Sequence, residues 1–166
     1  MTAILFICTG NIFRSVTAEY ALRSALGADS SYLIGSAGIE AIPQPMHPLV
    51  RERLHEKGAD PSPHRQRKLT PELLERTDLA VAIGLNHQDY VATHFGRHAP
   101  LFNEICWQQS VPVLDVHEAL PNWESEGSIA TDYMRSVIDH IWHAMPAFMR
   151  NLEYYFPAER ASSESR

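Results

Sequence analysis

A cysteine and an arginine lie close together near the start of the chain, with a glycine and an asparagine between them. The octet that contains them reads Cys8, Thr9, Gly10, Asn11, Ile12, Phe13, Arg14 and Ser15. Five residues separate the thiol from the guanidinium, enough for a loop whose backbone N–H groups surround a tetrahedral anion. A helix that begins after the loop would add its positive N-terminal end, which favours both an anion and a thiolate. The octet therefore predicts a thiol nucleophile that attacks phosphorus.

The spacing of the cysteine and the arginine is by itself a weak signal, because a cysteine that ends a strand is commonly a small buried hydrophobe. The residues between them strengthen it. Gly10 permits the backbone conformations of a tight anion loop, and Asn11 tolerates left-handed geometry better than most residues. Arg14 offers a planar fork that can grip two phosphoryl oxygens. The residues expected to bind phosphate are Thr9, Gly10, Asn11, Ile12, Phe13 and Ser15.

Short apolar runs predict the strands that position this loop. They cover residues 3–8, 32–35 and 79–83 and, more weakly, the neighbourhood of 101–102. Helical patterns alternate with these runs, which predicts one α/β domain: a four-stranded parallel sheet with helices on both faces and right-handed crossovers. Ligands of such sheets bind beyond the carboxyl ends of the strands, where Cys8 lies.

Helices are expected at four places before the long C-terminal one. These are residues 16–26 closed by Gly27, residues 49–57, a segment capped by Thr70, and a segment from the cap Asn86 to about residue 94. An apolar stripe over 129–155 predicts a core-facing helix that Pro146 kinks or breaks. Residues 112–127 show no periodicity and read as a long loop. The domain is expected to span 1–156, with 157–166 as a frayed polar tail.

The composition narrows the classes of function. The 166 residues suffice for one domain with a substantial core, and 45% hydrophobic and 20% charged residues are ordinary for a globular protein. A net charge of −6 argues against nucleic acid or an anionic membrane surface as partner, and no apolar stretch could span a bilayer. The presence of only two cysteines and the lack of a secretory signal favour a cytoplasmic location. The nine histidines show no metal-ligand spacing, so neither a metal nor another cofactor is expected.

Several motifs in order resemble the low-molecular-weight protein tyrosine phosphatase family, over roughly residues 3 to 155. The loop matches the family pattern Cys-x-Gly-Asn-x-Cys-Arg-Ser except at Phe13. The other matches are Ser36-Ala37-Gly38, the segment His64-Arg65-Gln66-Arg67, and the strand at 78–83. The resemblance implies a Rossmann-like phosphotyrosine phosphatase I fold, with Asn11, Ser15, Ser36 and His64 supporting the loop.

The resemblance also implies the general acid. The family uses an Asp in an Asp-Pro-aromatic turn before the last helix, and the matching residue here is Asp115, although the proline and the aromatic are absent. In the implied mechanism Cys8 attacks phosphorus while Asp115 protonates the leaving oxygen, and Asp115 then activates the water that releases phosphate from phosphocysteine. Glu118 and His117 are the alternative proton carriers.

The chain departs from the family at two places. Phe13 replaces the loop cysteine that can trap an oxidised nucleophile as a disulfide, so oxidation of Cys8 should proceed further; Cys106 is read as structural. The rims of the site carry fewer aromatics than in the tyrosine-directed relatives. The residues available there are Ile39, Ile42, Val116, His117 and Trp123.

The expected substrate is phosphotyrosine in proteins or a small aryl phosphate, with phosphate, vanadate or arsenate as oxyanion ligands. A phosphoarginine phosphatase is an alternative, although Ile12 stands where relatives of that type have Thr. An arsenate reductase on the same scaffold is another, although the thioredoxin-coupled kind needs more cysteines than Cys8 and Cys106. A phosphate-binding pseudoenzyme is the third, and it would not need the thiol.

Overall fold

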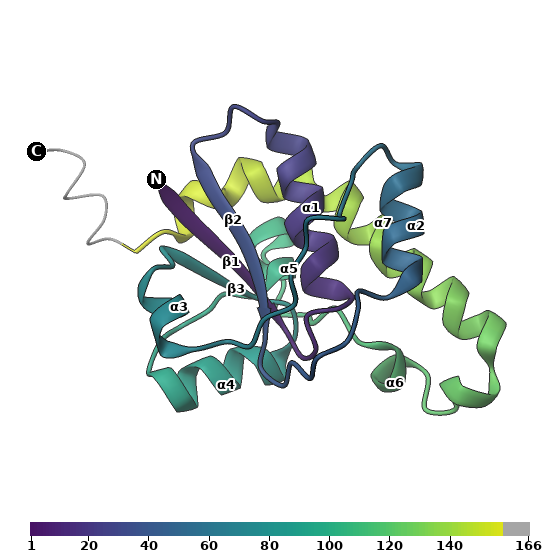
Figure 1. Ribbon diagram of the computed structural model, residues 1–166. Helices are drawn as coiled ribbons and strands as arrows, with labels where there is room; N and C mark the ends of the chain where they lie inside the picture. The colour runs from purple at the N-terminus through teal and green to yellow at the C-terminus, as the bar shows by residue number, and fades with distance from the viewer. Residues whose placement is uncertain (158–166) are drawn as a thin grey trace, which may run out of the picture.

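Three parallel strands form the sheet that carries the candidate site. The computed structural model describes residues 1–157, with strands β1 (Thr2–Cys8), β2 (Tyr32–Gly38) and β3 (Leu79–Ala82). Their order is β2-β1-β3, and Figure 1 shows β1 in the middle. Cys8 is opposite Gly38 in the register of β1 and β2. The parallel α/β sheet expected from the sequence is therefore confirmed.

The expected fourth strand is wrong. In the described residues Leu101 forms one isolated parallel bridge with Ala82, and helix α5 (Phe102–Trp107) begins at the next residue. The side chain of Glu104 accepts a hydrogen bond from the backbone N–H of Leu101 at 3.3 Å, which caps the helix. The helix cap thus ends the extended backbone after a single bridge.

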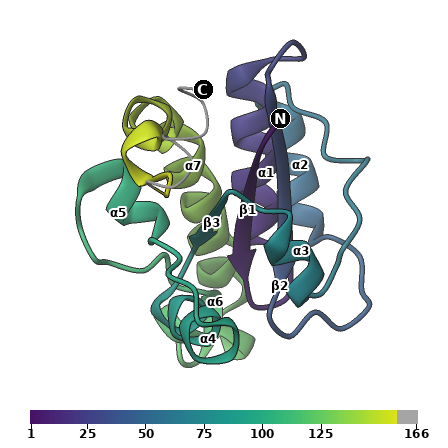
Figure 2. The same ribbon diagram turned by 90° about the vertical axis from the view of Figure 1, so that its left-hand side faces the viewer.

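Helices cover both faces of the sheet, as expected. In chain order they are α1 (Arg14–Leu26), α2 (Pro48–Glu56), α3 (Pro71–Glu75), α4 (Leu85–Phe95), α5, α6 (Val116–Ala119) and α7 (Gly127–Asn151), with 3-10 turns η1 (Trp123–Ser125) and η2 (Leu152–Tyr155). Side chains of β1 alternate between the two faces. Phe6 and Cys8 pack with α1, α2, α5 and α7, whereas Leu5 and Ile7 pack with α3 and α4. Figure 2 shows α1 and α7 side by side on the first face.

Two helix starts test the capping predictions. Thr70 caps α3 as expected, since its Oγ1 accepts from the N–H of Leu73 at 3.2 Å. Asn86 does not cap α4. That helix begins at Leu85, with Gly84 as its cap, two residues earlier than expected, and the ring of His87 accepts the hydrogen bond from the N–H of Gly84. His87 is the third residue of the helix, and accepting from the N–H of the cap residue is the role of the third helical residue in a capping box.

The C-terminal third differs from expectation in two ways. Residues 112–127 are not one continuous loop, because they contain α6 and η1. Helix α7 continues through Pro146, so of the expected kink or break the break does not occur; the 3-10 turn η2 begins only at Leu152. Of the expected frayed tail, residues 158–166 lie outside the described part of the chain. In residues 1–157 no helix is long and apolar enough to cross a membrane.

Candidate active site

The loop between β1 and α1 turns its carbonyl groups outward. Each carbonyl of residues 8–13 accepts a hydrogen bond from a group outside the loop. The donors to these six oxygens, in order, are the N–H of Ile39, the N–H of Glu40, Nε2 of Gln66, Nε2 of His64, the N–H of His47 and the N–H of Thr17, at 2.7 to 3.0 Å. These contacts fix the curvature of the loop, because every peptide plane has one end tied to its surroundings.

The N–H groups of the same loop are left free. In the described part of the chain, the backbone N–H groups of residues 9–14 have no hydrogen-bond acceptor. Asn11 has a φ of 56°, the left-handed conformation that its sequence position suggested. The loop borders a cavity of about 590 Å³ that Cys8, Arg14 and Asp115 also line. Unpaired donors beside a guanidinium make this cavity suited to an oxyanion.

Cys8 lies at the carboxyl end of β1, where a network of side chains reaches its sulfur. Sγ is 2.8 Å from Oγ of Ser15. The side-chain amide of Asn11 donates to Oγ of Ser15 and to Oγ of Ser36, both at 2.9 Å. Because Ser15 already accepts this bond, its own proton is available to donate to the sulfur. A hydroxyl that donates to sulfur stabilises the thiolate.

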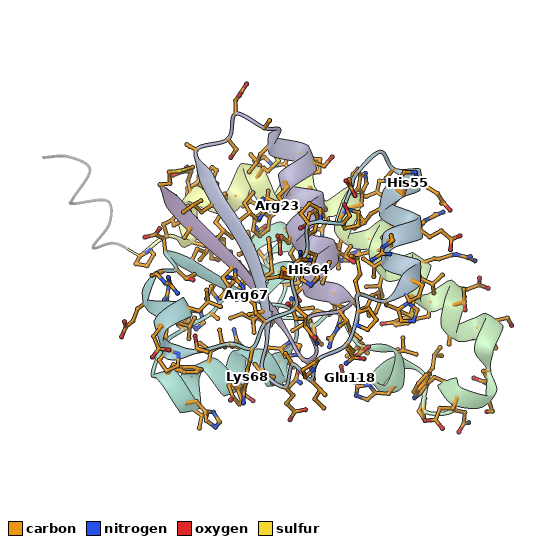
Figure 3. The ribbon with its side chains drawn as sticks, viewed as in Figure 1. Arg23, His55, His64, Arg67, Lys68 and Glu118 are labelled. Atoms are coloured by element: carbon orange, nitrogen blue, oxygen red, sulfur yellow. The ribbon has the colours of Figure 1, made fainter. Side chains whose placement is uncertain are left out.

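A buried carboxylate anchors the far end of this network. Oγ of Ser36 donates to Oε1 of Glu19 at 2.6 Å, and Nδ1 of His64 lies 3.9 Å from the same oxygen. Oδ1 of Asn11 accepts from the backbone N–H of Arg67 at 3.0 Å. Figure 3 shows His64 and Arg67 on the segment that runs along β2. The structure therefore brings Asn11, Ser36 and His64 together behind the loop, as the family pattern implies.

Gly38 lets β2 approach the loop. A Cβ at this position would lie 2.5 Å from the carbonyl oxygen of Thr9 and 3.0 Å from the backbone nitrogen of Asn11, distances that real Cβ atoms do not adopt without a shift of the backbone. Strand β2 extends three residues beyond the expected end at residue 35, so the glycine reaches the register position opposite Cys8. Any larger residue would push the loop away from β2.

Arg14 and Asp115 meet at the edge of the cavity. Nη1 of Arg14 donates to the carbonyl of Val113 at 2.9 Å, and Nη2 lies 3.3 Å from Oδ2 of Asp115. Oε1 of Glu118 lies 3.7 Å from Nη1. The guanidinium is only 2% exposed, and the two carboxylates beside it compensate its charge.

Asp115 caps helix α6, which stands where the family has an Asp-Pro-aromatic turn. Oδ1 of Asp115 accepts from the N–H of Val116 at 2.7 Å, and the N–H of Asp115 donates to Oε1 of Glu118 at 3.0 Å. This reciprocal arrangement is a capping box. His117 lies beside it, with Nδ1 3.7 Å from Oδ2 of Asp115 and a side chain that is 63% exposed.

Three residues that contact the site were not singled out from the sequence. Glu19 accepts a hydrogen bond from Ser36 in the network, and Gln66 donates to the carbonyl of Gly10. The ring of His87 is 2.8 Å from Oγ1 of Thr9. Glu19 alone left a signal: it is a carboxylate four residues after Ser15, one turn further along the same helix face. His87 and Gln66 come from segments distant in sequence, so local patterns could not place them.

Two other expectations concern the surroundings of the loop. Ile39 does not line the cavity, because it faces the opposite core with Leu5 and Ile7. Trp123 does line it.

Cys106 lies in α5, and burial raises the pKa of its thiol to about 12. Within residues 1–157 no group of three or more His, Cys, Asp or Glu side chains could hold a metal ion.

Known proteins share parts of this sequence and most of its fold. A probable low molecular weight protein-tyrosine-phosphatase, EpsP of Ralstonia solanacearum, is 42% identical over 82 residues, which cover 49% of this chain and 54% of that protein. The protein-arginine-phosphatase of Bacillus subtilis (strain 168) is 36% identical over 97 residues, 57% of this chain and 64% of that protein. The chain thus aligns with somewhat more than half of the length of these relatives.

A solved structure matches nearly the whole chain. It is the YwlE arginine phosphatase variant in which serine replaces cysteine and the active-site serine is phosphorylated, with 28% identity, a TM-score of 0.73, and coverage of 92% of this chain and 96% of that one. Residues 3–155 match the family described as Low molecular weight phosphotyrosine protein phosphatase. This span includes the loop, the network behind it and Asp115, and the chain therefore belongs to the low molecular weight phosphotyrosine protein phosphatase family.

Proposed function

We propose that the protein is a cysteine-dependent phosphatase that hydrolyses phosphomonoesters through a phosphocysteine intermediate. One observation carries the proposal: the unpaired N–H groups of residues 9–14 border the same cavity as Cys8 and Arg14. These donors would hold the equatorial oxygens of a phosphoryl group as charge spreads over them in the transition state. Arg14 adds a charged fork that grips two of these oxygens.

The first step forms a bond between Sγ of Cys8 and phosphorus while the bond from phosphorus to the ester oxygen breaks. Asp115, protonated, gives its proton to that departing oxygen and becomes a carboxylate. The relative whose active-site serine is phosphorylated supports a covalent step at the corresponding position. In the second step Asp115 takes a proton from water, the water oxygen bonds to phosphorus, and the bond from phosphorus to sulfur breaks.

Asp115 is favoured over Glu118 as the acid by its position. Asp115 lines the cavity that Cys8 borders, and Glu118 is not among the lining residues. Glu118 instead accepts the hydrogen bond from the N–H of Asp115, which fixes the backbone of the acid. We therefore assign proton transfer to Asp115 and positioning to Glu118.

We infer that the substrate is an aryl phosphate, with phosphotyrosine as the protein-borne form. Apolar side chains dominate the wall beside the loop. They include Ile12, Phe13, Leu49, Trp123 and Met134. A phenyl ring would bury apolar surface against this wall while its phosphate reaches Cys8.

Phosphoarginine is the second candidate, because two carboxylates also line the cavity. Glu40 and Glu124 could pair with a guanidinium group, and one curated relative is a protein-arginine-phosphatase. Ile12 counts against this substrate. It offers no hydrogen-bonding group where relatives of that type have Thr.

The test compares phosphate release from matched peptides that carry phosphotyrosine, phosphoarginine or phosphoserine, with arsenate turnover in parallel and the Cys8→Ser variant as control. We expect the highest kcat/KM for phosphotyrosine. Faster release from phosphoarginine would assign the second substrate instead. Consumption of thiols that depends on arsenate would indicate a reductase, and phosphate binding without hydrolysis of any peptide would indicate a binding protein.

A further inference from the structure

A buried histidine contacts the phosphate loop without lining the cavity. His87 lies in the first turn of α4, is fully buried and does not line the cavity. Its Nδ1 is 2.9 Å from the backbone nitrogen of Gly84, and its Nε2 is 2.8 Å from Oγ1 of Thr9. The ring therefore connects the start of α4 to the second residue of the loop.

These two contacts decide which ring nitrogen carries the proton. A backbone N–H can only donate, so Nδ1 accepts from Gly84 and has no proton in the neutral ring. The proton is then on Nε2, which donates to Oγ1 of Thr9. Burial, together with the nearby positive charge of Arg14, lowers the pKa of His87 to about 3. The ring is thus neutral, and its direction of donation is fixed, throughout the neutral pH range.

The contact leaves the hydroxyl proton of Thr9 free. Oγ1 receives the bond from His87, and in the described part of the chain no acceptor is found for its own proton. Thr9 lines the cavity together with Cys8 and Arg14. We propose that the hydroxyl of Thr9 donates to an oxygen of the bound phosphoryl group and that His87 is the positioning residue that orients it. This inference rests on the proposed function and adds a side-chain donor to the backbone donors of the loop.

The alternative is that His87 only caps α4, and four substitutions separate the two roles. Thr9→Val removes the hydroxyl at nearly constant shape, and Thr9→Ser retains it. His87→Asn keeps an acceptor near the position of Nδ1 but loses the donor to Thr9, whereas His87→Gln offers a donor near the position of Nε2. Thr77→Val serves as the control for a buried threonine, because its hydroxyl bonds the carbonyl of Leu73 at the opposite end of the sheet.

The measurement is the affinity of the full-length protein for inorganic phosphate by calorimetry, with thermal unfolding of each variant alongside. A hydrogen bond to a charged group is worth enough that Thr9→Val should weaken binding by about 10- to 100-fold. We expect Thr9→Ser and Thr77→Val to bind like the wild type. His87→Asn should weaken binding more than His87→Gln does. In the Thr9→Val background, His87→Asn should have no further effect on affinity, because the group that it orients is gone.

The outcomes test the roles of Thr9 and His87 independently of the proposed phosphatase activity. Wild-type affinity in Thr9→Val would overturn the role of the hydroxyl, even in a protein that hydrolyses phosphotyrosine. An undiminished effect of His87→Asn in the Thr9→Val background would overturn the positioning role and leave His87 as a helix cap. A wild-type protein that binds phosphate but hydrolyses no ester would overturn the proposed function, while the binding data would still decide the role of Thr9.

Discussion

Cys8 and Cys106 are buried to nearly the same extent in the same apolar cluster, yet their polar surroundings differ. Cys8 is 2% exposed and Cys106 is 3% exposed. Cys8 ends a strand, faces a loop of unpaired N–H groups and has the Ser15 hydroxyl 2.8 Å from its sulfur. Cys106 lies within α5 against α7, and its thiol donates to the carbonyl of Ala144 at 3.8 Å. Burial alone therefore does not decide whether a thiol is a nucleophile.

The difference lies in the sign of the partial charges around each sulfur. A carbonyl oxygen and apolar neighbours oppose a thiolate, and burial raises the pKa of Cys106 to about 12. The polar groups around Cys8 are instead hydrogen-bond donors, namely the Ser15 hydroxyl and the unpaired N–H groups of the loop. Under the proposed function, the same chain uses one cysteine for packing and the other for attack on phosphorus.

The largest expected difference comes from replacing the two cysteines one at a time. Cys8→Ser should lower the turnover of an aryl phosphate by at least roughly 10⁴-fold, because the nucleophile is lost. Cys106→Ala removes only a buried sulfur and should leave kcat/KM near that of the wild type, with a loss of stability of about 1 kcal/mol. Steady-state kinetics and urea unfolding measure both. Equal losses of activity in the two variants would remove the distinction between the cysteines.

The guanidinium of Arg14 is the next largest contribution. Arg14→Lys keeps the charge but loses the fork, so we expect kcat/KM for an aryl phosphate to fall by about 10²- to 10³-fold. Arg53→Lys is the matched control and should leave kcat/KM unchanged, because Arg53 pairs with Asp139 of α7 and with Glu56 of its own helix α2. An Arg14→Lys enzyme of full activity would show that charge without geometry suffices.

Gly38 tests whether the shape of the loop matters apart from its chemical groups. Gly38→Ala places a Cβ against the carbonyl of Thr9 and should reduce kcat/KM by on the order of 10²-fold through a displaced loop. Gly127→Ala also adds a Cβ to a residue that lines the cavity, but this Cβ meets open space, so the variant is the control for an added Cβ that does not displace the loop. Both are compared by kinetics and by phosphate affinity. If Gly38→Ala behaved like its control, the close approach of β2 would have no role in the site.

Alkylation compares the reactivity of the two thiols directly. Because the pKa of Cys106 is raised to about 12, this residue should stay a thiol and resist iodoacetamide in the folded protein up to about pH 10. Cys8 should be labelled at neutral pH, and phosphate should protect it. Peptide mass spectrometry after labelling identifies the modified residue. Labelling of Cys106 first would reverse the comparison.

The smallest expected effect concerns recovery from oxidation. Phe13 stands where relatives have a second loop cysteine, so oxidised Cys8 lacks a neighbouring thiol and should pass on to irreversible states. After peroxide treatment, thiols should restore less activity to the wild type than to a Phe13→Cys variant. Complete recovery of the wild type after prolonged exposure would contradict this view.

The local features of the site were predictable from the sequence. The octet places the loop between a strand and a helix, and the left-handed φ of Asn11 follows from its residue type. Strands 3–8 and 79–83 were recognised by their apolar runs, because both are buried on two faces. The Thr70 cap followed from its position before Pro71.

Features that depend on contacts between distant segments were not predictable. The ring of His87 reaches Thr9 only because α4 follows the strand next to β1. The prediction of a fourth strand was wrong because Glu104 caps a helix there. In the sequence this capping residue is a weaker local signal than the apolar run before it. Helix α6 did have a signal, since Asp115 and Glu118 stand at the spacing of a capping box.

The most direct test of the account is to trap the intermediate. In Asp115→Asn the second step lacks its base, so the phosphorylated enzyme should accumulate during turnover of an aryl phosphate such as p-nitrophenyl phosphate, whose phenolate leaves without needing the proton that Asp115 gives in the first step. Acid quench followed by peptide mass spectrometry then locates the phosphoryl group. We predict one phosphoryl group on the peptide that contains Cys8 and none on the peptide that contains Cys106. Phosphate release by the wild type with no phosphorylated cysteine trapped in either protein would contradict the central claim.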